Sequence, residues 1–242
     1  MNGYNQSPFA NITPVVKYLL IINILVFIGA VSIGRFFPNV MQYLPIYYFN
    51  SPHFRVWEII TYMFMHAGLD QPEHILFNMF ALFSFGPILE YSMGPKKFLN
   101  LYFICGIGAV ICNQVVQAYG VHAITGTFTI AHPELSSTFA QYLGSAQKLA
   151  DIYYVPTVGA SGAIFGLLVA FGMMFPNLEL MILFIPVPIK AKYIIPVYIL
   201  IELFLGYKQY AWDPVAHFAH LGGALFGYLL VKIWKLQNSG NY

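Results

Sequence analysis

Continuously apolar stretches of about twenty residues constrain this chain more than any other feature. They lie near 14–33, 74–92, 97–119, 155–175, 190–206 and 214–234. A helix needs about 20 apolar residues to span a bilayer, and barrel strands are excluded because they alternate apolar and polar residues. The sequence therefore predicts an all-α membrane protein, built as a bundle of six transmembrane helices.

The low charge content also indicates a membrane protein. Charged residues make up 8% of the 242-residue chain, whereas a soluble domain carries about 25%. The fifth span is the least regular, because Pro186, Pro188 and Pro196 interrupt it. The polar segment 1–13 lacks the charged n-region and cleavage site of a signal peptide, so we expect the first span to remain as an anchor.

Basic residues near the span ends predict the orientation. Seven lie on one side, Lys17, Lys96, Lys97, Lys190, Lys192, Lys232 and Lys235, and four on the other, Arg35, Arg55, Lys148 and Lys208. We expect cytoplasmic termini, with 1–13 as an N-terminal segment, 14–235 as the six-helix domain and 236–242 as a tail. A polar outer-face insert is expected at 120–150, and the net charge of +2 gives no indication of nucleic-acid binding.

A single hydroxyl stands among glycines at the start of the fourth span. We expect the second, fourth and sixth spans to begin at prolines, because proline suits the first helical turn; these are Pro72, Pro156 and Pro214. At a rise of about 1.5 Å per residue, Ser161, His220 and Asn78 then lie roughly 7–9 Å below the outer ends of their helices. The three side chains are predicted to share one layer.

These residue types correspond to the parts of a serine hydrolase. Ser161 needs a base to remove its proton, and His220 is the candidate. His74, Asn78 and the Ser161 backbone N–H are candidate donors to the oxyanion. Phe165 lies one turn below Ser161, where it either stacks on the His220 ring or is a core aromatic.

Two pairs of glycines flank the candidate serine and histidine. Gly162 with Gly166, and Gly223 with Gly227, form small-xxx-small faces that let membrane helices approach closely. Such faces either merely hold a bundle together or bring Ser161 within reach of His220. Their positions beside both side chains favour the second interpretation.

The sequence shows no obvious carboxylate for a third member of the site, so we expect a Ser–His dyad. Asp151 and Asp213 look like loop or cap residues. Glu202, in the fifth span, is either a gating or hydrogen-bonding residue or a side chain that snorkels to water from near the helix end. We favour the second interpretation for Glu202.

No metal site is expected. Metalloprotease helices place two histidines four apart with an adjacent glutamate, whereas His217 and His220 are three apart without one. His217 is predicted to be a helix-start residue near the outer surface.

Three motifs in order make the chain resemble the rhomboid family of intramembrane serine proteases. They are His74-Ile75-Leu76-Phe77-Asn78, Gly159-Ala160-Ser161-Gly162 and Ala219-His220-Leu221-Gly222-Gly223. The resemblance implies peptide-bond hydrolysis within or beside the spanning helix of single-pass membrane proteins, without metal or organic cofactor. It implies Ser161 as nucleophile, His220 as base, and His74 with Asn78 in the oxyanion hole.

The compact chain looks like the minimal bacterial form of the family, which points to the cytoplasmic (inner) membrane. One departure is that Glu58 follows Trp57, where many bacterial relatives carry arginine. Two other functions stay open: a catalytically inactive relative that binds membrane clients without cutting them, and, less favoured, a transporter with polar groups around broken helices.

Overall fold

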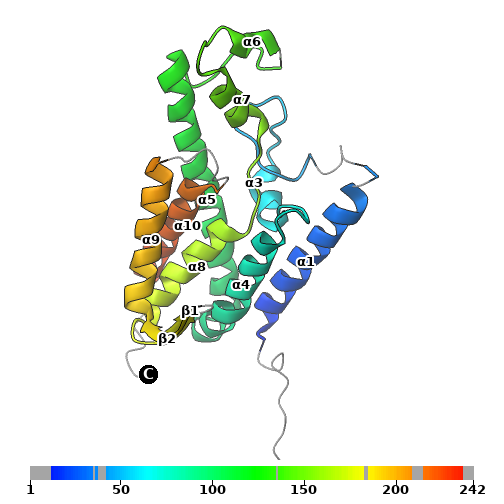
Figure 1. Ribbon diagram of the computed structural model, residues 1–242. Helices are drawn as coiled ribbons and strands as arrows, with labels where there is room; N and C mark the ends of the chain where they lie inside the picture. Colours follow the sequence, from blue (N-terminus) through cyan, green and yellow to red (C-terminus); the bar gives the residue numbers. More distant parts are fainter. Residues whose placement is uncertain are drawn as a thin grey trace, which may run out of the picture.

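The computed structural model describes residues 12–34, 36–37, 42–134, 136–182, 185–208 and 215–236. Within these ranges, six long helices form the bundle in Figure 1. They are α1 (Pro14–Gly34), α4 (Pro72–Met93), α5 (Pro95–Thr125), α8 (Ser161–Met174), α9 (Ala191–Lys208) and α10 (His217–Ile233). The length and composition of α1, α4 and α5 are sufficient for crossing a membrane, and α8 is a shorter apolar helix. The predicted all-α membrane bundle is confirmed.

Shorter elements connect these helices. α3 (Glu58–Thr61) and the 3-10 helix η2 (Tyr62–Phe64) precede α4, while α6 (Ser136–Ala140) and α7 (Ala146–Tyr154) lie between α5 and α8. A hairpin of β1 (Glu179–Ile182) and β2 (Ile185–Lys190) joins α8 to α9, with its strands paired antiparallel. The sequence did not predict this hairpin.

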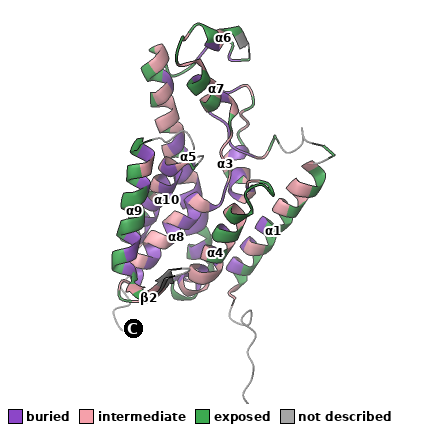
Figure 2. Cartoon of the chain, in the orientation of Figure 1, coloured by how far each residue is buried: buried purple, intermediate pink, exposed green. Residues whose placement is uncertain are grey.

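Helix α8 lies at the centre of the bundle. It packs against α4, α5, α9 and α10, and buried residues concentrate around it in Figure 2. By contrast, the outer faces of α1 and α9 expose large apolar side chains, as expected where lipid replaces water. These side chains include Tyr18, Leu25, Ile28, Val197, Leu200 and Phe204.

The predicted spans agree with the structure to different degrees. The bounds of α1, α4 and α9 lie within two residues of the prediction, and α9 continues through Pro196 instead of ending there. The prediction for the fourth span is wrong at its start, because α8 begins at Ser161 and not near 155.

The late start of α8 is caused by a backbone pairing just before it. Thr157 exchanges two hydrogen bonds with Ile46, at 3.0 and 2.8 Å, so Pro156 lies in an extended segment and opens no helix. Pro72 does occupy the first turn of α4, whereas Pro214 lies outside the described residues. Ser161 therefore reaches the depth of the site through an extended chain that runs down to α8 (Figure 1).

Two buried glutamates accept backbone hydrogen bonds from neighbouring segments of the chain. The Glu90 carboxylate of α4 accepts the backbone N–H groups of Val15 and Val16, at 3.0 and 2.9 Å, and so binds the amino end of α1. Before α4, the fully buried Glu58 accepts the Tyr47 N–H at 3.2 Å, and burial raises the pKa of this carboxyl. Glu58 thus ties the loop before α3 to that helix.

The region predicted as an insert shares a small core with the loop before α3 and the end of α7. Tyr48, Val121, Ile130, Phe139, Leu149 and Tyr153 form a cluster separate from that of the bundle. The Tyr153 hydroxyl donates to Asn50 Oδ1 at 2.7 Å, which links α7 to the loop before α3. Figure 1 shows α6 and α7 beyond the end of the bundle, beside the extension of α5.

The four glycines of the sequence pattern lie where α8 crosses α10. A Cβ added at Gly223 would lie 1.8 Å from the carbonyl oxygen of Gly162, and one added at Gly227 would lie 2.4 Å from that of Gly166. These neighbours are backbone atoms and have no rotamer with which to move away. The two helices therefore approach more closely than any larger residue permits.

Replacing Gly223 by alanine is expected to destabilise the folded protein by about 1–3 kcal/mol or more, because a buried methyl group meets backbone. Thermal unfolding in detergent measures the effect. Gly29→Ala is the matched control, since nothing lies within 4 Å of a Cβ at this position of α1. Equal melting temperatures for the two variants would contradict the close crossing of α8 and α10.

Candidate active site

Ser161 is the first residue of α8, and the backbone just before it needs a glycine. Gly159 has a φ of 128°, which L side chains rarely adopt. A Cβ at Gly159 would also lie 2.9 Å from His74 Nε2 and 3.4 Å from Ser161 Oγ. Glycine at this position therefore leaves a small space that both the serine and His74 face.

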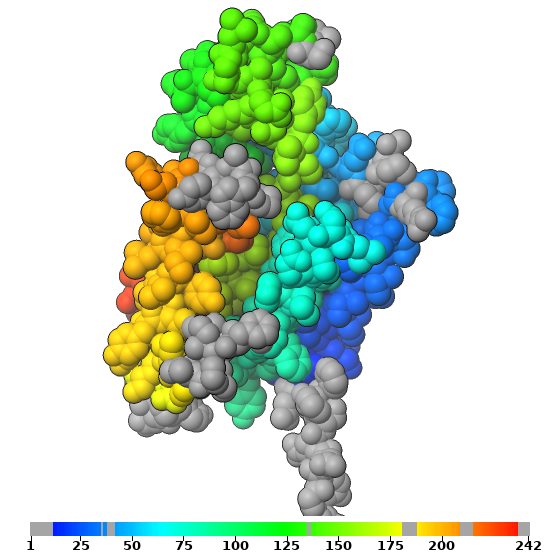
Figure 3. Space-filling view, in the orientation of Figure 1, coloured from blue at the N-terminus to red at the C-terminus, as the bar shows by residue number. Residues whose placement is uncertain are grey.

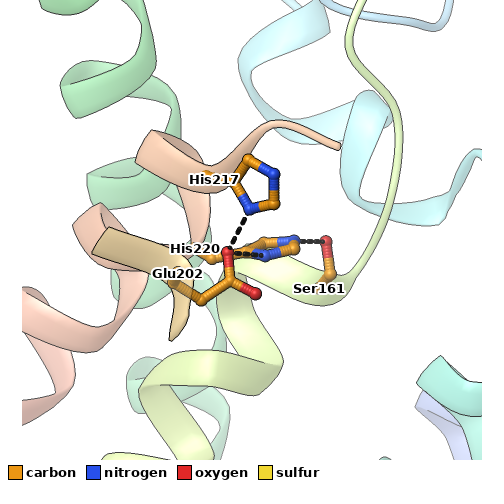
Figure 4. A network of polar contacts seen from close by, with 4 residues as sticks. All are labelled: Ser161, Glu202, His217 and His220. Atoms are coloured by element: carbon orange, nitrogen blue, oxygen red, sulfur yellow. Dashed lines mark hydrogen bonds and ion pairs between the residues drawn. The ribbon is translucent and has the colours of Figure 1, made fainter. Parts of the chain in front are cut away.

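The hydroxyl of Ser161 lies within hydrogen-bond reach of His220. Ser161 Oγ is 2.8 Å from His220 Nε2, as Figure 4 shows. His220 comes from the first turn of α10, and the glycine crossing brings this turn beside the start of α8. The Phe165 ring stacks on the His220 ring with centroids 4.3 Å apart and planes 9° apart. This stacking restricts rotation of the imidazole.

Glu202 supplies a carboxylate to the same site, which differs from the predicted dyad. Glu202 is only 9% exposed, and its Oε2 lies 3.0 Å from His220 Nδ1. The expectation that Glu202 snorkels to water is therefore wrong. A carboxylate accepts a hydrogen bond from the Nδ1–H of His220, and this tautomer leaves the Nε2 lone pair facing the Ser161 hydroxyl. Ser161, His220 and Glu202 thus have the connectivity of a catalytic triad.

His217 reaches the same carboxylate oxygen. His217 Nδ1 lies 2.7 Å from Glu202 Oε2, and the two histidine rings are nearly perpendicular, at 88°. His217 is the first residue of α10, as predicted, and its side chain is buried. Glu202, His217 and His220 each bring one possible metal-ligand atom into a group whose atoms all lie within 4.8 Å of one another.

His74 presents a donor to the space beside Ser161. Its Nδ1 lies 3.3 Å from the Ala67 backbone N–H and accepts from it, so in the neutral ring Nε2 carries the proton. The ring of His66 packs edge-on against His74 with centroids 5.3 Å apart. Burial lowers the pKa of His66 to about 4, which keeps this neighbour neutral at ordinary pH.

Asn78 lies one helical turn below His74 and bonds to its own helix. Its Nδ2 donates to the His74 carbonyl at 2.6 Å. Its Oδ1 is buried without a partner among the described residues. One N–H of the amide remains for a further acceptor, while the bond to His74 fixes the amide orientation.

Sequence reasoning missed Glu202 and His217 as members of this site. The sequence does signal both, because a glutamate in an apolar helix is a functional hypothesis by default, and His217 lies one turn before His220. Neither signal indicates that α9 and α10 pack with these side chains facing each other. That pairing follows from tertiary contacts between the two helices.

Comparison with known proteins identifies the family. The rhomboid domain model matches residues 53–236. An uncharacterised mitochondrial rhomboid protein of Schizosaccharomyces pombe is 28% identical over 217 residues, covering 78% of this chain and 54% of that protein. The human mitochondrial presenilin-associated rhomboid-like protein is 27% identical over 209 residues, covering 82% of this chain and 45% of that protein.

The mitochondrial rhomboid protein 1 of Saccharomyces cerevisiae is 29% identical over 158 residues, covering 64% of this chain and 36% of that protein. The chain spans about half the length of the first two relatives, at 54% and 45%. Because these relatives are mitochondrial, they give no support to the predicted bacterial subtype or to a bacterial cytoplasmic membrane. The domain match includes the helices that carry Ser161, Glu202 and His220, and this membrane protein belongs to the rhomboid family.

Proposed function

We propose that this protein is an intramembrane serine endopeptidase that cleaves the spanning segments of single-pass membrane proteins. The observation that carries the proposal is the 2.8 Å separation between Ser161 Oγ and His220 Nε2. A serine hydroxyl and an imidazole at this distance can exchange a proton as the hydroxyl attacks a carbonyl carbon. Glu202 extends the proposed site from a dyad to a triad.

The reaction proceeds in two halves. Ser161 Oγ bonds to the scissile carbonyl carbon while its proton passes to His220 Nε2, and His220 then gives that proton to the leaving amine as the C–N bond breaks. Water attacks the acyl-enzyme, with its proton taken by His220, and the acid product leaves as Ser161 regains a proton. Throughout, the Glu202 carboxylate stabilises the imidazolium that forms and holds the ring orientation.

The negative oxygen of each tetrahedral intermediate needs donors. His74 Nε2 faces the space beside Ser161, and the backbone N–H groups of the first turn of α8 point toward the same helix end. Asn78 is a second side-chain candidate, because one N–H of its amide bonds to the His74 carbonyl and the other remains for a further acceptor. In a site partly shielded from water, such donors stabilise developing charge more strongly than they would in water.

Substrate approach is proposed to occur from the bilayer, between α4 and α9. In Figure 3, α8 is visible between these helices on the face shown, and Ser161 at its start is half-buried. A substrate helix must unwind locally, because the backbone hydrogen bonds of an intact helix shield its carbonyl carbons from a nucleophile. The family resemblance favours clients with small residues at the cleavage point. The predicted orientation, with both termini cytoplasmic, is part of this proposal.

A fluorophosphonate probe tests the proposed chemistry independently of substrate identity. The activated hydroxyl displaces fluoride from phosphorus, and its proton passes to His220. We expect peptide mass spectrometry to find the adduct on Ser161 of the folded protein and to find none after prior unfolding. Ser92→Ala is the matched control, because Ser92 is an α4 serine bonded to the Ile88 carbonyl; it should label like the wild type.

Labelling should accompany cleavage of a single-pass reporter in liposomes. If the folded wild type neither takes up the probe nor cleaves any of several reporters, the client-binding function replaces the protease. Cleavage without a Ser161 adduct would instead place the chemistry at another residue.

A further inference from the structure

The acidic and histidine side chains behind the serine have the composition of a metal site. Glu202 comes from α9, while His217 and His220 come from α10. All three are buried, at 9%, 7% and 9% exposure, and Figure 4 shows both rings turned toward one carboxylate. Two imidazoles and one carboxylate are a known zinc ligand set that leaves a fourth position open.

The geometry is close to that of a bound ion. Glu202 Oε2 lies 2.7 Å from His217 Nδ1 and 3.0 Å from His220 Nδ1. Zinc binds nitrogen and oxygen at about 2.0–2.2 Å, so the ligand atoms would need to spread by roughly half an ångström to surround it. All three ligand atoms already lie within 4.8 Å of one another.

We propose that Glu202, His217 and His220 form an inhibitory site for a divalent transition-metal ion, with Zn²⁺ as its prototype. The inhibition rests on the proposed protease function, while the binding does not. The site differs from that of a metalloprotease, because here the ion occupies the atoms that activate the serine instead of activating water. The sequence did not indicate it, since the third ligand comes from a different helix than the two histidines.

The mode of inhibition follows from the position of a proton. Without metal, His220 donates from Nδ1 to Glu202 and offers the Nε2 lone pair to Ser161. A metal bound at Nδ1 displaces that proton, and a neutral imidazole then carries its proton on Nε2. An Nε2–H can donate to the Ser161 hydroxyl but cannot accept its proton. The nucleophile is therefore not activated while the ion is bound.

Ligand chemistry predicts which ions act. Imidazole suits zinc, copper and nickel, whereas magnesium and calcium prefer sites made of oxygen ligands. At equal concentration, Zn²⁺ is expected to inhibit reporter cleavage and Mg²⁺ is not. A chelator should restore the rate, because no covalent bond forms.

His217→Gln is the decisive variant, because it removes one ligand and keeps an N–H that can donate to Glu202. Each variant is compared with its own metal-free rate, so that changes in basal activity cancel. Losing a residue that only supports a metal ligand typically weakens metal binding by about 10–100-fold. His217→Gln removes a ligand itself, so we expect the Zn²⁺ concentration for half inhibition to rise by more than that. His132→Gln is the control, since exposed His132 also pairs with a glutamate, Glu134, at 3.1 Å; its inhibition should equal that of the wild type.

Binding is measured separately from proteolysis through the visible absorption of Co²⁺ added to the Ser161→Ala protein. This variant keeps all three ligands. A tetrahedral Co²⁺ spectrum that Zn²⁺ abolishes, and that His217→Gln removes, supports the site even if no reporter is ever cleaved. The absence of that spectrum, or equal Zn²⁺ inhibition of wild type and His217→Gln, overturns the proposal.

Discussion

Replacing Ser161 by alanine is expected to lower the cleavage rate below detection. Loss of the nucleophile of a serine protease typically reduces kcat by about 10⁶-fold. His220→Ala should have nearly the same effect, because an unactivated serine hydroxyl is a poor nucleophile. The double variant should be no slower than either single one, since the two groups act as a unit. Initial rates on one purified single-pass reporter, in liposomes, measure all three proteins.

The control for this first prediction is Ser92→Ala, which removes a hydroxyl from α4 without touching the site. Ser161→Ala should unfold at a temperature close to that of the wild type, because the Ser161 hydroxyl is small and half-buried. Cleavage that persists in Ser161→Ala at a rate similar to Ser92→Ala would show that another group attacks the peptide bond.

The second large effect is expected for Glu202→Gln. Loss of the carboxylate of a serine triad costs up to about 10⁴-fold in kcat, because the imidazole then adopts the wrong tautomer. A glutamine amide can donate to His220 Nδ1 and so favour an Nε2–H, which cannot accept the serine proton. We expect kcat to fall by about 10²–10⁴-fold while KM stays nearly constant. Fluorophosphonate labelling of Ser161 should slow in parallel.

Glu90→Gln is the matched control for Glu202→Gln. Glu90 is another buried glutamate in a spanning helix, at 2% exposure, but it binds the amino end of α1. We expect Glu90→Gln to lower the melting temperature and to leave kcat close to the wild-type value. If Glu202→Gln instead lowers the melting temperature and leaves kcat near the wild-type value, Glu202 is a structural residue and the dyad is sufficient.

Much of the fold is legible in the sequence, because membrane helices satisfy their own backbone hydrogen bonds. A twenty-residue apolar stretch has few alternatives in a bilayer, so α1, α4 and α9 lie within two residues of their predicted bounds. The start of α8 could not be predicted from the sequence. It depends on the pairing of Thr157 with Ile46, which are far apart in the chain.

Some residues of the candidate site could also be predicted from the sequence, and others could not. Local patterns alone nominate Ser161 among glycines and His220 beside Gly223, because a polar side chain in an apolar helix next to a close-packing face is visible in one segment. The role of Glu202 is decided only in three dimensions. Whether the Glu202 carboxylate reaches water or bonds to a histidine depends on which face of α9 packs against α10. The rotation of α9 about its own axis decides this, and it is set by side-chain packing between the helices. The sequence by itself therefore determined a six-helix membrane bundle with a candidate serine and histidine, and the tertiary structure decided that Glu202 and His217 converge on that histidine.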